Sequence, residues 1–284
     1  MQEDLTGMPC DASAGCGATS KWSIATAALE TFLPTAETKV NWGLKLFASG
    51  SNSSCSVSTT AEVAPAPSNA AAISTVLDAT VASSSTPTTL ALTNAAAYLK
   101  SFTDPNPKFI LLVTDGSPTC GASLCPAGTT ATTPQCDDEN AIAKVHAIYD
   151  GMGIPVFVLG IGTSMSPGSE TLSRMAMAGG YPRAASPAYY PIESGDDLSR
   201  AFGTVSGLVA SCYLIVTPAP KSASEIIDVK GDGTVLPADP ANGWTFATAA
   251  NSAGIRLNGK ACEDYKSGAI KSVAVDLDLV CAAP

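Results

Sequence analysis

The chain has 284 residues, of which 45% are hydrophobic and only 14% are charged, and its formal net charge is −10. This length suits one large domain with a smaller one, and the apolar residues suffice for sizeable cores. The acidic balance, with no Lys/Arg cluster longer than two residues, argues against a nucleic-acid partner. No apolar run is long enough to predict a membrane-spanning helix.

Helical and strand patterns alternate along the first two thirds of the chain. Apolar residues at helical spacing predict helices at residues 20–33, 69–79, 88–102, 137–151, 168–180 and 194–212. Apolar or alternating runs predict strands at residues 39–48, 56–64, 109–114, 154–161 and 188–192. This alternation predicts an α/β domain with a doubly wound, mainly parallel sheet.

The pattern changes near Cys212. Short strand-like runs with turn signals follow, and no strong helical pattern interrupts them. The Lys230–Thr234 stretch, KGDGT, is typical of a hairpin turn and lacks the acidic spacing of a calcium loop. We therefore expect two domains, an α/β domain at residues 1–211 and a small all-β domain at residues 212–284.

Nine cysteines indicate disulfide bonds formed in an oxidising compartment, because most lie in loops rich in Gly, Ser, Thr and Pro. Their spacings do not match the paired pattern of zinc sites. The odd number leaves at least one cysteine without a partner in the chain. The cysteines are Cys10, Cys16, Cys55, Cys120, Cys125, Cys136, Cys212, Cys262 and Cys281.

Asp115 directly follows the apolar run at residues 109–114, in the stretch FILLVTDGSPTC. Ligands of open parallel sheets bind beyond the carboxyl ends of the strands, so this carboxylate is a candidate ligand. Thr86, just before the helix predicted at residues 88–102, could add a hydroxyl. Together they would form a hard-oxygen site for Mg²⁺, with Mn²⁺ or Ca²⁺ as alternatives. The simpler interpretation is that Asp115 caps its loop and Thr86 caps its helix.

The order of several segments resembles the von Willebrand factor A (vWA) domain, especially its bacterial extracellular members. The matching segments, within residues 20–211, are SKWSIATAALETFL, VNWGLKLFA, SSTPTTLAL, FILLVTDGSPTC and IPVFVLGIG. The resemblance implies a doubly wound sheet with one antiparallel edge strand. It also implies a metal-ion-dependent adhesion site (MIDAS) built from an Asp-x-Ser-x-Ser loop, a threonine and an aspartate. Thr86 and Asp115 match the last two.

The Asp-x-Ser-x-Ser loop itself is missing from this chain, and no apolar strand precedes residue 20. CDASAG, with Asp11, Ser13 and Cys16, is a weak imitation without a leading strand. The resemblance therefore implies that Met1 lies just after the motif, and that the missing loop, the central strand and an export signal lie upstream. On this hypothesis metal binding would be weak or absent. The strands at residues 39–48 and 109–114 would keep unpaired edges, and the chain would be prone to aggregate.

We expect a secreted, non-catalytic adhesion or recognition module, located outside the cell or in a bacterial cell envelope, for instance as a lipoprotein. Its partner would be a protein or surface glycan that offers an acidic side chain to the cation. One alternative is a subtilisin-like serine hydrolase, in which GTSMSP would supply Ser164 and His146, the single histidine, would be the base. Another is a structural cell-envelope protein with a vestigial metal site.

Overall fold

The computed structural model describes most of the chain, which forms two compact units. The described residues are 3–5, 8, 17–37, 40–49, 54–82, 85–103, 108–120, 133–162, 168–183, 185–210, 212–249, 252–266, 269–270 and 272–278. The first unit comprises residues 1–102, 109–182 and 186–206, and the second comprises residues 103–108, 183–185 and 207–284.

The first unit alternates helices and strands along the chain. Its helices are α1 (Lys21–Ala36), α2 (Ala70–Asp78), α3 (Thr88–Ser101), α4 (Thr133–Met152), α5 (Ser169–Ala178) and α6 (Gly195–Ala210), which runs on into the second unit. Its strands are β1 (Trp42–Leu44), β2 (Val63–Ala66), β3 (Ile110–Thr114), β4 (Val156–Ile161) and β5 (Tyr190–Ile192).

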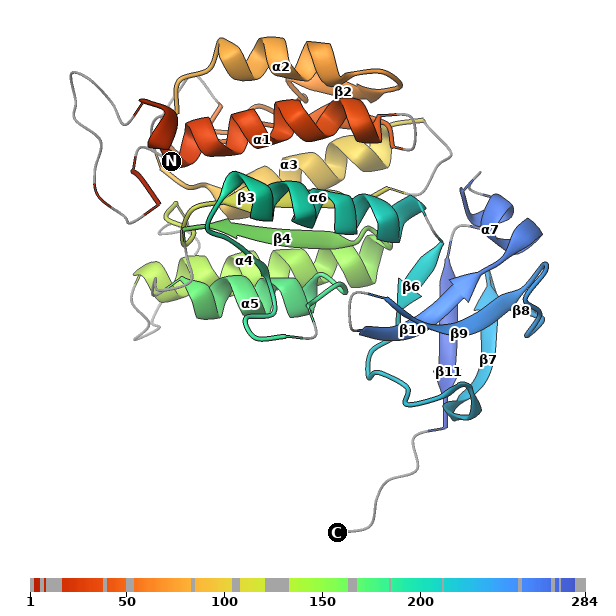
Figure 1. Ribbon diagram of the computed structural model, residues 1–284. Helices are drawn as coiled ribbons and strands as arrows, with labels where there is room; N and C mark the ends of the chain where they lie inside the picture. The colour runs from red at the N-terminus through yellow and green to blue at the C-terminus, as the bar shows by residue number, and fades with distance from the viewer. Residues whose placement is uncertain are drawn as a thin grey trace. The chain divides into compact units, whose positions relative to one another are not determined.

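Strands β3, β4 and β5 form a parallel sheet with β4 in the middle. Every residue of β4 is buried, as expected for a central parallel strand covered on both faces. Figure 1 shows α1 and α6 on one side of this sheet and α4 and α5 on the other. On the α4 side, Leu112 and Val158 pack in one apolar cluster with residues of α3, α4 and α5.

Aromatic side chains fill the other face of the sheet. Phe157 of β4 contacts Tyr181 and Phe109, with ring centroids 4.7 and 6.0 Å away. Phe109 meets Trp42 at 5.5 Å. Phe32 of α1 continues the row, because it lies 6.1 Å from Trp42 and 5.2 Å from a ring of α6. This row joins the parallel sheet to β1 through side chains rather than backbone hydrogen bonds.

The prediction of a doubly wound, mainly parallel sheet is wrong. Among the described residues, β1 pairs with β2 alone in a two-stranded antiparallel sheet, and β3 pairs with β4 alone. The parallel sheet therefore has three strands, and the other sheets are small and antiparallel. The apolar patterns identified the strands, but they carry no information about which backbone edges meet.

Several predicted elements differ in length. Helix α1 continues through Pro34, which falls in its last turn, where little helix remains to be disrupted. Helix α4 begins at Thr133, so Cys136 lies in a helix rather than in the preceding loop. The strand predicted at residues 39–48 shortens to β1, because its pairing with β2 shifts register between Trp42 and Leu44.

The second unit has two antiparallel sheets of three strands each, ordered β6-β10-β9 and β11-β7-β8. Its elements are β6 (Tyr213–Ile215), β7 (Ile226–Gly231), β8 (Thr234–Leu236), β9 (Trp244–Ala249), β10 (Ser252–Leu257), α7 (Gly259–Lys266) and β11 (Val273–Leu277), with a short 3₁₀ turn at Ala223–Glu225. Helix α7 was not expected from the sequence, since its polar run, GKACEDYK, has few apolar residues to mark a helical face.

The predicted KGDGT turn is confirmed. Gly231 pairs with Thr234, and the two residues between them, Asp232 and Gly233, both have positive φ angles, of 47° and 83°. This is the backbone conformation of a two-residue hairpin turn that matches the strand twist. The KGDGT stretch is therefore a structural turn that joins β7 and β8 of one sheet.

A disulfide bond lies in the core of the second unit. Cys212 and Cys262 are bonded, with Cα atoms 5.6 Å apart, and Cys212 is 1% exposed. The bond packs with Trp244, Val229 and other buried apolar residues. The expectation of disulfide bonds is thus confirmed for this pair; Cys281 lies outside the described residues.

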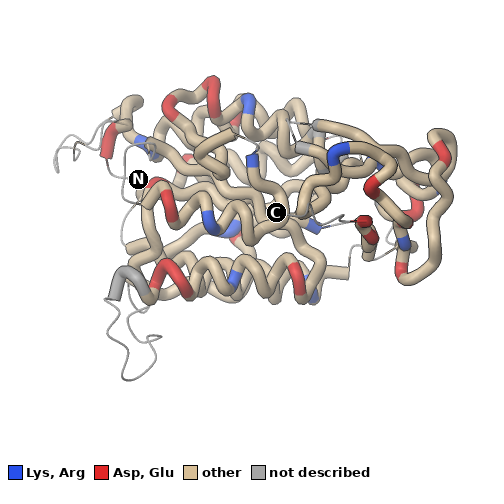
Figure 2. The backbone as a smooth tube through the Cα atoms, turned by 90° about the horizontal axis from the view of Figure 1, so that it is seen from below, with Lys and Arg blue, Asp and Glu red and all other residues tan. Residues whose placement is uncertain are grey.

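Charged residues are dispersed over the backbone. Figure 2 shows Lys and Arg at separated positions rather than gathered in one stretch. None of the helices in the described ranges is long and apolar enough to cross a lipid bilayer.

Candidate functional site

Asp115 follows β3 at a sharp turn, at the carboxyl edge of the parallel sheet. The buried hydroxyl of Thr114 donates to the carbonyl of Gly116 (3.2 Å) and accepts from its amide (3.4 Å), so the backbone bends at Asp115. The Asp115 side chain is half-buried. The sequence argument therefore placed this carboxylate correctly, just beyond the strand end.

Thr86 lies beside the segment that follows Asp115. Its amide donates to the hydroxyl of Thr119 (2.9 Å), and its carbonyl accepts from the amide of Thr119 (3.1 Å). The same carbonyl accepts from the amide of Thr88 (2.8 Å), at the start of α3. The structure thus places Thr86 against Thr119, in the segment that follows Asp115, although the two segments are far apart in sequence.

A disulfide bond joins a third segment to this edge. Cys120, next to Thr119, is bonded to Cys55, with Cα atoms 5.6 Å apart. We call the three segments 54–62, 85–88 and 115–120 the loop cluster. The expectation that cysteines in loops form disulfide bonds is confirmed for this pair. Cys136 is also disulfide-bonded, whereas Cys10, Cys16 and Cys125 lie outside the described residues.

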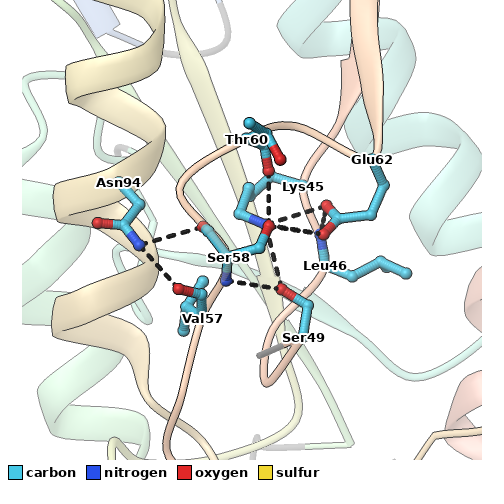
Figure 3. Close-up of polar contacts among 8 residues, drawn as sticks. All are labelled: Lys45, Leu46, Ser49, Val57, Ser58, Thr60, Glu62 and Asn94. Atoms are coloured by element: carbon cyan, nitrogen blue, oxygen red, sulfur yellow. Dashed lines mark hydrogen bonds and ion pairs between the residues drawn. The ribbon is translucent and has the colours of Figure 1, made fainter. Parts of the chain in front are cut away.

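A mostly buried ion pair holds the first segment of the loop cluster. The Lys45 ammonium lies 2.8 Å from the Glu62 carboxylate, and their side chains are 13% and 19% exposed. Figure 3 shows Ser58 between them, since its hydroxyl accepts from Lys45 (2.8 Å) and hydrogen-bonds Glu62 (3.3 Å). Asn94 of α3 donates to the carbonyls of Val57 and Ser58, both at 3.1 Å. The segment that carries Cys55 is therefore attached to α3.

The hydroxyl groups of Thr86 and Ser117 are among those in the loop cluster that make no hydrogen bond with the described residues. Both residues are half-buried. Ser117 sits against Gly168 at the start of α5, where a Cβ atom would lie 2.6 Å from the Ser117 hydroxyl. Glycine at position 168 therefore permits the close approach of this loop to the helix.

A buried lysine adds a positive charge near the same edge. Lys21, the first residue of α1, has a side chain that is 4% exposed, and its ammonium lies 3.0 Å from the Glu3 carboxylate. Its Cε atom lies 3.0 Å from the position of a Cβ atom on Gly162, just beyond β4. Glu3 neutralises this charge, which would otherwise oppose a cation at the carboxyl edge.

The residue types of the loop cluster suit a hard divalent cation, because they include a carboxylate, that of Asp115, and the hydroxyls of Thr86 and Ser117. The set is small, and no group of three or more His, Cys, Asp or Glu side chains within the described ranges is placed to hold a metal. Mg²⁺ suits such a site better than Ca²⁺, since it keeps several waters and accepts few protein ligands.

The remaining candidates from the sequence do not join this site. Ser164, Asp11, Ser13 and Cys16 lie outside the described residues. His146 is exposed on α4, next to the fully buried Val145. No described contact connects it to the loop cluster.

Thr119 and Ser117 were missed by the sequence argument. Both hydroxyl residues stand within four positions of Asp115, in DGSPT, and that proximity was the available signal. Their roles could not be inferred from it, because hydroxyl residues are frequent in all the loops of this chain.

No family model and no curated protein matches the chain. Two solved structures of the pilus adhesin SpaC from Lactobacillus rhamnosus GG are similar to it. The first has a TM-score of 0.47 and 14% identity, over 85% of this chain and 35% of the adhesin. The second, in an open conformation, has a TM-score of 0.45 and 15% identity, over 84% and 35%. The chain thus spans about a third of the adhesin, and likeness at this level establishes no family.

Proposed function

We propose that this protein is a non-catalytic recognition module that binds a ligand through a divalent cation, Mg²⁺ in the first instance, held at the loop cluster. Asp115 would supply the negative charge, and Thr86 would supply a neutral oxygen. Such a site would serve the adhesive role that the vWA resemblance implies. A carboxylate from the partner would complete the coordination of the metal.

The observation that carries the proposal is the pairing of the Thr86 and Asp115 segments. Thr86 is held through its backbone alone, by Thr119 of the segment that follows the half-buried Asp115, and no hydrogen bond among the described residues occupies the Thr86 hydroxyl. An ordinary helix cap would instead use that hydroxyl to accept from an amide in the first turn. Neither Thr86 nor Pro87, the residue preceding α3, makes such a bond.

Disulfide bonds in both units fit a protein of an oxidising compartment. We therefore propose that the module acts outside the cell or in the cell envelope. The low density of positive charge suits a partner that reaches the protein through a cation rather than through Lys or Arg.

The proposal can be tested with an immobilised peptide that carries one glutamate, compared with the same peptide carrying glutamine. Retention of the chain on the glutamate peptide should require Mg²⁺, disappear with EDTA, and be lost in Asp115→Asn. The exposed Asp150 of α4 offers a matched control, because Asp150→Asn changes the net charge equally without touching the loop cluster.

Other outcomes would favour other functions. Equal retention of Asp115→Asn and the unaltered chain would contradict the proposal. If neither chain is retained on the glutamate peptide although both fold normally, the result would favour a structural envelope module with a vestigial site. Labelling of Ser164 by a fluorophosphonate probe would favour the hydrolase.

A further inference from the structure

Thr119 makes two hydrogen bonds with the backbone of one residue, Thr86, although the Thr119 side chain is exposed. Its hydroxyl accepts from the Thr86 amide at 2.9 Å, and its amide donates to the Thr86 carbonyl at 3.1 Å. We propose that Thr119 is a positioning residue for the cation site, acting with the adjoining Cys55–Cys120 disulfide to fix Thr86 beside the Asp115 segment. This inference rests on the proposed function.

The Thr119 hydroxyl is already engaged as an acceptor, whereas the Thr86 hydroxyl has no partner among the described residues. This division assigns the two threonines different tasks. Thr119 holds a neighbouring backbone, and Thr86 presents an oxygen. A ligand whose position is fixed before the cation arrives binds it more tightly, because less conformational freedom is lost on binding.

One exposed pair of hydrogen bonds would hold Thr86 weakly, since water competes for the same groups. The structure adds constraints that close into a ring. The first residue of α3, Thr88, hydrogen-bonds Thr86, and Thr86 in turn hydrogen-bonds Thr119. The chain then leads from Thr119 to Cys120, which is bonded to Cys55. It returns from Val57 and Ser58 to α3 through the side chain of Asn94.

A closed ring distributes the constraint, so that each link limits the movement of the others. The Lys45–Glu62 ion pair strengthens the return path, because Glu62 also accepts from Ser58 and from the amide of Leu46 (2.7 Å). The inference follows that a residue without contact to the cation should control its affinity. At Thr119 a single, nearly isosteric substitution removes one of the two hydrogen bonds by which Thr119 holds Thr86, that of the Thr86 amide to the Thr119 hydroxyl.

The test compares Thr119→Val, which removes the hydroxyl, with Thr119→Ser, which retains it. The probes are Mn²⁺ binding by calorimetry and hydrogen exchange of the Thr86 amide by NMR, both on the full chain. We expect Thr119→Val to weaken Mn²⁺ binding about fivefold, the effect of one hydrogen bond, and to lose protection of the Thr86 amide. Thr119→Ser should retain both, and Cys55→Ala/Cys120→Ala should weaken Mn²⁺ binding at least as much as Thr119→Val.

The two readouts separate this inference from the proposed function. Equal Mn²⁺ affinity in Thr119→Val, despite faster Thr86 exchange, would refute positioning of the cation site. Unchanged hydrogen exchange of the Thr86 amide in Thr119→Val would refute the inference that Thr119 positions Thr86, whatever the Mn²⁺ affinity of this variant. If the unaltered chain takes up no Mn²⁺ while Thr86 exchange responds as expected, the proposed function fails, and Thr119 still positions Thr86.

Discussion

The two described disulfide bonds close loops of similar length but lie in different surroundings. Cys55–Cys120 spans 65 residues and joins two half-buried loops, whereas Cys212–Cys262 spans 50 residues and lies within an apolar core. By loop length alone, each would stabilise the fold by about 4 kcal/mol. Their contributions to function should differ, because Cys55–Cys120 holds polar loops in place and Cys212–Cys262 reinforces a core that is already packed.

This difference shows that one disulfide bond can stabilise a small apolar core, whereas another fixes the arrangement of polar loops. The second unit is short, and a core of this size gains from a bond that restricts the unfolded chain. The loop cluster has few apolar side chains of its own, so its arrangement depends on Cys55–Cys120, the Lys45–Glu62 pair and the Asn94 hydrogen bonds.

The largest expected effect comes from removing the core disulfide. Cys212→Ala/Cys262→Ala should destabilise the second unit by about 4 kcal/mol, through the greater freedom of its unfolded chain. Urea unfolding followed by hydrogen exchange with mass spectrometry reports the two units separately. Mn²⁺ affinity should stay unchanged, in contrast to Cys55→Ala/Cys120→Ala; a loss of affinity would mean that the two bonds are not functionally distinct.

The ion pair behind the loop cluster should have a smaller effect on stability. Glu62→Ala leaves the Lys45 ammonium, in a side chain that is 13% exposed, without its carboxylate, and should cost about 1–3 kcal/mol in urea unfolding. Lys45→Met/Glu62→Leu removes both charges and should recover most of that loss. If the double variant is as unstable as Glu62→Ala, the cost lies in the hydrogen bonds to Ser58 and Leu46 rather than in the lone charge.

Two neighbouring acids on α4 should respond to pH in opposite ways, with the smallest effects. Burial raises the pKa of Asp138, despite the Thr171 hydroxyl, so its protonated form favours folding. That contribution is present below the unfolded pKa of about 3.9 and is lost as the pH rises through the folded value. Asp138→Asn should therefore raise the melting temperature at pH 7 and have little effect near pH 3.

Glu139 provides the matched control. Its hydrogen bond with Arg174 lowers the pKa of Glu139, so its contribution is present above about pH 4.3 and is lost as the pH falls. Glu139→Gln should lower the melting temperature slightly at pH 7, because the ion pair is well exposed and contributes less than about 1 kcal/mol to the free energy of unfolding. A change of the same sign in both variants would contradict these assignments.

The sequence was sufficient to locate the elements and the two candidate ligands. Apolar runs ending at Thr114 and beginning near Thr88 placed Asp115 and Thr86 at the edges of real elements. Strand pairing was not predictable, because β1 and β3 carry apolar patterns that suit one sheet, yet the contact between these two regions is the ring pair of Trp42 in β1 and Phe109, just before β3. The role of Thr119 was hidden for a similar reason: it depends on a contact with Thr86, across more than thirty residues, that leaves no periodic pattern.

The central claim is that the loop cluster binds a divalent cation through Asp115, and Mn²⁺ titration of the full chain by calorimetry tests it most directly. The account predicts a saturable site on the unaltered chain that Mg²⁺ competes for, retained in Asp150→Asn and weakened at least about tenfold in Asp115→Asn. Identical isotherms for Asp115→Asn and the unaltered chain would contradict it.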